Sequence, residues 1–191
     1  MNNLRIIAAF AVALVLLITV CKETKGTLQE QPKRKAADLR FRAPAEWITE
    51  QPSSSMRVAQ YKLPKAEGDL EDASLVLYFF GSNQGGSVQA NLDRWISQIA
   101  QPDGSPSLTK AKTETLDLNQ LKVTTIDLAG TYTAEMAPGS ETRHNKPGYR
   151  LRAAVIETPK GAYYVKLVGP AKTIDRWDKT FIAYLRSFEF K

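Results

Sequence analysis

Most connections between the expected strands of this sequence are of hairpin length, and this constrains the fold more than any other feature. Strands are expected at Lys110–Leu118 and Leu121–Tyr132, with only an Asn-Gln dipeptide between them. Strands at Tyr149–Glu157 and Ala162–Val168 are joined by TPKG, whose proline and glycine occupy the positions preferred in a type I turn. Parallel strands need a crossover of a dozen or more residues. The sequence therefore predicts antiparallel hairpins.

Two earlier strands and two amphipathic helices complete the expected domain. Residues 56–63 and 74–80 are read as strands, and the second is apolar and aromatic enough to be buried on both faces. Apolar residues recur at helical spacing within 88–99 and 174–188. An antiparallel sheet flanked by helices is an α+β domain. The three tryptophans, Trp47, Trp95 and Trp177, are expected to anchor its core.

The N-terminal segment has the composition of an export signal. Met1–Arg5 carries a positive charge, and Ile6–Val20 is an unbroken apolar run of fifteen residues, shorter than the about 20 of a membrane span. This is the pattern of a secretory signal peptide. The only cysteine, Cys21, follows at once. The run Ile18-Thr19-Val20-Cys21 resembles the lipobox of bacterial lipoproteins, in which the cysteine is lipidated, although a small residue usually stands in place of Val20.

The chain is therefore divided into a signal peptide (1–20), a lipidated Cys21 with a flexible tether (21–37) and one domain (38–191). An uncleaved signal anchor and ordinary secretion are the alternatives to a lipid anchor. Residues 1–36 hold six Lys and Arg against two acids, so most of the net charge of +6 precedes the domain. This distribution and the expected export argue against nucleic-acid binding. The domain contains no cysteine, so it is exported without disulfides.

A glycine-rich stretch, GSNQGGSV, follows the apolar strand and has the spacing of a phosphate-binding loop. That motif requires lysine and then Ser or Thr after the second glycine, whereas Ser87 and Val88 stand there. We therefore interpret the stretch as a joint between strand and helix, with Ser87 as the helix N-cap. The N–H groups of Gly85, Gly86 and Ser87 remain a candidate contact for an anion or a partner.

The long polar loop 136–148 and the strand after it supply the other candidate contacts. Arg143 lies in this loop, and Arg150 and Arg152 lie two residues apart, which places them on one face of a strand where both could contact an anion. The only histidine, His144, is expected to be a solvated loop residue. No metal site, cofactor or catalytic residue is predicted.

The order of elements and the ending GPAKTIDRWDKTFIAYLRSFEF resemble the PsbP-like family, which implies an α/β/α sandwich. The stretches GGSVQANLDRW and LKVTTIDLAGTY further resemble a group of uncharacterised exported bacterial proteins, over about residues 38–190. The PsbP-like family includes photosystem accessory proteins and small bacterial lipoproteins. No catalytic motif of the family maps onto this chain, so the resemblance supplies no functional residue.

The sequence thus predicts a membrane-anchored extracytoplasmic lipoprotein that acts as a non-enzymatic interaction or assembly-accessory module. Its expected place is the periplasm-facing side of the cell membrane or outer membrane, and its expected partners are the membrane, through Cys21, and a protein. The alternative is a lipoprotein that binds a small ligand or anion, and a hydrolase-type enzyme is the third reading.

Overall fold

The computed structural model describes residues 39–191, so the predicted signal peptide, Cys21 and the tether lie outside the described residues. The elements follow one another as β1 (Leu39–Arg40), β2 (Ile48–Glu50), β3 (Arg57–Leu63), β4 (Ala73–Phe79), α1 (Val88–Ile96), β5 (Ile99–Ala100), the 3-10 helix η1 (Ser107–Thr109), β6 (Lys112–Leu118), β7 (Leu121–Tyr132), β8 (Lys146–Thr158), β9 (Gly161–Pro170), α2 (Ala171–Arg186) and β10 (Glu189–Phe190).

Eight of these strands form one antiparallel sheet in the order β2-β3-β4-β9-β8-β7-β5, and β6 also pairs with β7. Strands β1 and β10 form a separate antiparallel pair. Both predicted hairpins, β6–β7 and β8–β9, are present. In the first hairpin Asn119 and Gln120 both have positive φ, as a two-residue type I′ turn requires. The predicted α+β class is confirmed.

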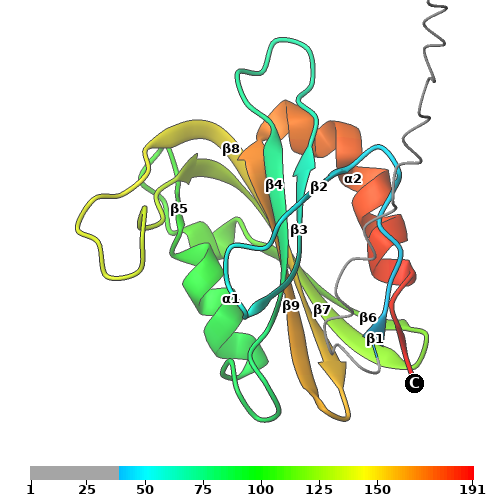
Figure 1. Ribbon diagram of the computed structural model, residues 1–191. Helices are drawn as coiled ribbons and strands as arrows, with labels where there is room; N and C mark the ends of the chain where they lie inside the picture. Colours follow the sequence, from blue (N-terminus) through cyan, green and yellow to red (C-terminus); the bar gives the residue numbers. More distant parts are fainter. Residues whose placement is uncertain (1–38) are drawn as a thin grey trace, which may run out of the picture. The chain divides into compact units, whose positions relative to one another are not determined.

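The two helices lie against opposite faces of the sheet (Figure 1). Along β8, Ala154 and Ile156 belong to the core that contains α2, whereas Ala153 and Val155 belong to the core that contains α1. Because successive side chains of a strand point to opposite faces, these two cores are separated by the sheet. The result is the predicted helix–sheet–helix sandwich.

The larger core, on the α2 face, is strongly aromatic. Trp47 packs with its ring centroid 5.1 Å from that of Tyr184, and Phe41 stacks on Phe188 at 5.1 Å. The predicted core positions of Trp47, Trp95 and Trp177 are confirmed, since each is less than a tenth exposed.

The structure moves some predicted boundaries. Helix α1 ends at Ile96, and Ile99 instead pairs with Tyr132 as part of β5. Helix α2 begins at Ala171 and ends at Arg186. The loop predicted at 136–148 is shorter, because β8 begins at Lys146 and Glu135 forms a β-bridge with Arg143. Neither helix of the described part is long and apolar enough to cross a membrane.

Candidate functional site

The face of the sheet that carries α1 is hollowed beside this helix. The hollow, which we call the α1 groove, has a volume of about 570 Å³ and is lined by β3, β4, β9, α1, the end of β7 and the segment 134–144. Its charged residues are Arg57, Arg94, Glu135, Arg143 and Lys166, and His144 also lines it. Its aromatic residues are Tyr78, Phe80, Trp95, Tyr132 and Tyr164.

Lys166 is the most unusual of these residues, because it is a cation in the middle of a central strand. Its neighbours across β4 and β8 are Val76 and Ala153, both buried. Its Nζ donates hydrogen bonds to Gln98 Oε1 at 2.6 Å and to the Tyr132 hydroxyl at 3.0 Å. Both acceptors are neutral, so the ammonium is held without a carboxylate in the described part of the chain. Burial, and secondarily the charge of Arg94, lower the pKa of Lys166 to about 8.

Flat aromatic rings stand beside this lysine. Tyr78 lies on β4 and Phe80 directly follows that strand, and their rings lie 5.9 Å apart with an interplanar angle of 7°. Tyr132 stacks on His144 at 5.3 Å, and Lys166 Nζ lies 5.1 Å from the centre of the Tyr132 ring. The groove therefore combines cationic groups with ring faces, a combination that suits an anion with an adjoining apolar part.

The charge of the domain is concentrated in this groove. Residues 39–191 hold 20 Lys and Arg against 17 Asp and Glu, a net of +3. The groove alone holds four of these cations against Glu135, which is also a net of +3. Elsewhere in the domain the two signs are equal in number. A field concentrated in a concave surface raises the local concentration of anions.

The candidate turn at Gly85, Gly86 and Ser87 lies beside the groove and has a clear structural role. Ser87 caps α1 as predicted, because its side chain accepts a hydrogen bond from the N–H of Ala90 at 3.2 Å. The carbonyl of Gly86 accepts from the Tyr164 hydroxyl at 3.0 Å. Gly85 has φ +91°, and a Cβ there would lie 2.7 Å from the Tyr164 ring. The turn therefore closes on a residue that also lines the groove.

The three candidate arginines are not brought together. Arg143 lines the groove, where its Nη1 donates to the Thr133 carbonyl at 3.0 Å and its Nη2 lies 3.5 Å from Glu135 Oε1. Arg150 and Arg152 share a strand face, as predicted, but they face α2 on the opposite side of the sheet. There is no common site for all three.

Arg150 and Arg152 are paired with carboxylates of the chain itself. Arg150 makes a bidentate contact with Asp127, with Nε–Oδ1 at 2.7 Å and Nη2–Oδ2 at 2.6 Å, and its Nη1 donates to Asp175. Arg152 donates to Asp178. A free anion would have to displace these carboxylates, so the structure gives both arginines a role in joining α2 to the sheet.

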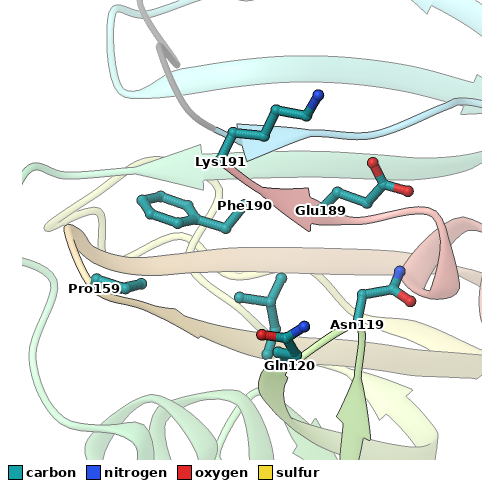
Figure 2. A pocket seen from close by; sticks show the side chains of 7 residues that line it. Asn119, Gln120, Pro159, Glu189, Phe190 and Lys191 are labelled. Atoms are coloured by element: carbon teal, nitrogen blue, oxygen red, sulfur yellow. The ribbon is translucent and has the colours of Figure 1, made fainter.

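A second hollow of about 420 Å³ lies where the β6–β7 and β8–β9 turns meet the C-terminal residues (Figure 2). Figure 2 shows that its side chains come from the β6–β7 turn, the β8–β9 turn and residues 189–191. Asn119 Nδ2 donates to the carbonyls of Arg186 and Phe188 at 2.8 and 3.0 Å. The Asn119 side chain, the main polar group of this hollow, thus holds the C-terminal end of α2 in place. The residues that line the hollow include no cluster of like charges.

Sequence reasoning missed Lys166, Arg94 and the aromatic rings around them. Their positions, 78, 94, 132 and 166, are far apart in the sequence and meet only when β4, α1, β7 and β9 are assembled. The one available signal was a single lysine within the apolar strand sequence AYYVKLVGP.

His144, expected to be solvated, instead stacks on Tyr132. Within residues 39–191 no group of three or more His, Cys, Asp or Glu could hold a metal ion.

Comparisons with known proteins concern the fold. No family model and no curated protein matches the chain. A crystal structure of a Pseudomonas aeruginosa protein of unknown function, described as a candidate regulator, is 12% identical, with a TM-score of 0.45, and the match covers 74% of this chain and 95% of that one. The solution structure of PsbP from the cyanobacterium Synechocystis is also 12% identical, with a TM-score of 0.45, and covers 81% and 94%. These are likenesses of fold alone.

Proposed function

We propose that this protein is an exported, non-enzymatic interaction module that is anchored to a membrane through Cys21 and binds a protein partner in the α1 groove. The single observation that carries the proposal is the concentration of the net positive charge of the domain in that groove. Residues 22–37 are the tether in this proposal, and the domain faces the periplasm. The anchor itself is inferred from the sequence around Cys21.

A binding role is favoured over hydrolysis by the way the groove residues are engaged. Ser97 and His144 both line the groove, but the Ser97 hydroxyl donates to the carbonyl of Arg94 at 2.9 Å, and the His144 ring stacks on Tyr132. A nucleophile and its base need to be within hydrogen-bond reach of each other. The groove residues instead present donors and ring faces, which suits recognition.

A small-ligand or anion-binding lipoprotein is the second candidate. It is favoured by one observation: Gln98 and Tyr132 both bond the ammonium of Lys166. A cluster of this size matches one anionic group rather than a protein surface. In that case the same groove would be filled by a free anion.

The anchor is tested by the intact mass of the full chain extracted from native membranes. We expect a chain that begins at Cys21 and carries acyl groups. An unmodified, shorter chain would contradict the lipid anchor, and a chain that begins at Met1 would make the protein signal-anchored.

The binding surface is tested by photo-cross-linking in native membranes. A photoreactive residue replaces Met136, which lines the groove and is 60% exposed, and in a matched control it replaces Leu108, which is 65% exposed and does not line it. We expect a discrete protein adduct from position 136 only. Adducts of equal yield from both positions, or none from 136, would refute the groove as the partner site.

A further inference from the structure

We propose that the inner part of the α1 groove, formed by Lys166, Tyr132, Gln98 and Arg94, is a carboxylate-binding subsite that receives an Asp or Glu side chain from an extended segment of the protein partner. The inference rests on the proposed function, because it assigns the chemistry of the partner at the same groove.

The first argument is that residues 39–191 give Lys166 no structural partner of opposite charge. Its strand is central, with β4 on one side and β8 on the other, and its hydrogen bonds go to an amide and a hydroxyl. Burying an ammonium without a carboxylate is unfavourable. An apolar side chain would pack against Val76 and Ala153 without this penalty. We therefore infer that the positive charge of Lys166 serves a negatively charged ligand from outside residues 39–191.

The second argument is the hydrogen-bonding capacity that remains at this place. An ammonium has three N–H donors, and two of those on Lys166 are used by Gln98 and Tyr132. Since the Tyr132 hydroxyl accepts from the lysine, its own proton is left to donate, and burial raises the pKa of Tyr132, which keeps that proton in place. The amide N–H₂ of Gln98 adds further donors.

These groups call for a ligand that only accepts hydrogen bonds. Ionised carboxylates are acceptor-only, with about four lone-pair sites on two oxygens. Arg94 lines the same groove, where its guanidinium donates to Asn91 Oδ1, and its charge also lowers the pKa of Lys166; it therefore supplies a second positive charge near the same point. A charge-assisted hydrogen bond to a carboxylate is stronger than one between neutral groups.

The third argument concerns the size of the ligand. The groove, at about 570 Å³, is much larger than one carboxylate requires. Beside the donors it presents the nearly parallel rings of Tyr78 and Phe80 and the stacked rings of Tyr132 and His144. An acidic side chain flanked by apolar or aromatic residues in an extended segment fits both features, because its neighbours would cover the ring faces.

The probe is a fluorescein-labelled peptide in which glutamate and tyrosine alternate, and the matched control peptide has glutamine in place of each glutamate. Binding to the full chain in non-ionic detergent is followed by fluorescence anisotropy. We expect the acidic peptide to bind at least about tenfold more tightly than the amide peptide, since hydrogen bonds to charged groups are strong. Equal binding of the two peptides would overturn the assignment of a carboxylate.

The decisive variant is Lys166→Met, which keeps the length of the side chain and removes the charge. Its matched control is Lys179→Met, on the exposed side of α2 and outside the groove. We expect a loss of about tenfold or more with Lys166→Met and no change with Lys179→Met. If Lys166→Met folds poorly, Arg94→Gln on the surface of α1 provides a second test of the same subsite, and it should weaken binding of the acidic peptide severalfold. Unchanged affinity in a folded Lys166→Met or Arg94→Gln protein would overturn the inference.

A separate arm distinguishes a protein segment from a free organic acid. Free glutamate and acetate are added at tens of millimolar, and the melting temperature of the full chain is followed, since a ligand that binds the native state must raise it. A shift that requires Lys166, together with no binding of the acidic peptide, would overturn the protein segment in favour of a small acid. Success of cross-linking from position 136 with failure of both arms would leave the interaction module in place and refute the carboxylate subsite.

Discussion

Removal of the Asp127 carboxylate is expected to loosen the attachment of α2 to the sheet. Asp127, on β7, lies directly opposite Arg152 on β8 and makes the bidentate contact with Arg150 described above. Its Oδ2 is also 3.9 Å from Arg152 Nη1. Asp127→Asn therefore removes the charge that both arginines share, and it leaves them with Asp175 and Asp178 on α2.

The size of this effect follows from the exposure of the groups. The side chains of Asp127 and Arg150 are 23% and 18% exposed, between the surface pairs that contribute about 0–1 kcal/mol and the fully buried pairs whose disruption costs about 3–5 kcal/mol. The remaining carboxylates are more exposed, at 63% for Asp175 and 38% for Asp178, so they compensate only in part. We expect a loss of about 2 kcal/mol, or about 4–8 °C in melting temperature for a chain of this size.

The assay is urea denaturation followed by circular dichroism, at neutral pH and again near pH 3. Burial alone would raise the pKa of Asp127, but the hydrogen bond from Arg150 and the charges of both arginines outweigh it and hold this pKa below its ordinary value. A carboxyl with a lowered pKa stabilises the fold above its unfolded pKa, and the stabilisation is lost as the pH falls through the folded pKa. The difference between wild type and Asp127→Asn should therefore be full at pH 7 and shrink towards pH 3.

The matched control is Asp117→Asn on the exposed strand β6, which should change stability by less than about 0.5 kcal/mol. A loss at Asp127→Asn no larger than that of the control, or a difference that does not depend on pH, would refute the argument that this carboxylate supports the two arginines that join α2 to the sheet.

Three further changes test other parts of the structure. Gly85→Ala should cost at least about 2 kcal/mol, because its Cβ would meet the Tyr164 ring at positive φ, whereas Gly104→Ala, with open space around it, should cost about 1 kcal/mol in urea denaturation. Tyr184→Phe should raise stability by up to about 1 kcal/mol, because within residues 39–191 its buried hydroxyl has no hydrogen-bond partner; a clear loss would mean that the hydroxyl is bonded. Lys166→Met should stabilise the protein at pH 7, and the gain should fade as the pH rises from about 8 towards 10.5, because the folded chain holds the Lys166 proton less tightly than the unfolded chain does; a constant gain would contradict that pKa.

The architecture of the domain could be predicted because its signals are local. The Asn-Gln turn, the TPKG turn and the spacing of apolar residues around Trp95 and Trp177 each act over fewer than twenty residues, and each gave the element found in the structure. The errors lie at boundaries that depend on distant contacts. Ile99 leaves the helical pattern because it pairs with Tyr132, more than thirty residues away, and no local preference could show this.

The candidate arginines show where local reasoning ends. Strand alternation correctly placed Arg150 and Arg152 on one face. It could not show that α2 would bring Asp175 and Asp178 over that face, because the distance between those residues is fixed only by the packing of helix on sheet. A pair of arginines that looks free in the sequence is thus already neutralised in the fold.

The groove forms because helix α1 is much shorter than the strands that it lies against, and the sequence alone did not show this consequence. Helix α1 has nine residues and is about 13 Å long, whereas β8 has 13 residues and extends over about 43 Å. A helix this short covers only part of the sheet face, so the rest is bordered by the segment 134–144 and stays open. Lys166 lies at the inner border of this open part, where Gln98 and Tyr132 cover its ammonium. The sequence shows only a lysine within an apolar strand, and the central place of β9, between β4 and β8, makes that lysine a charge bordered by the Tyr132 ring and by two hydrogen-bond acceptors. Lys166, the residue that best indicates a binding function, is therefore also the one whose surroundings depend most on the order of the strands in the sheet.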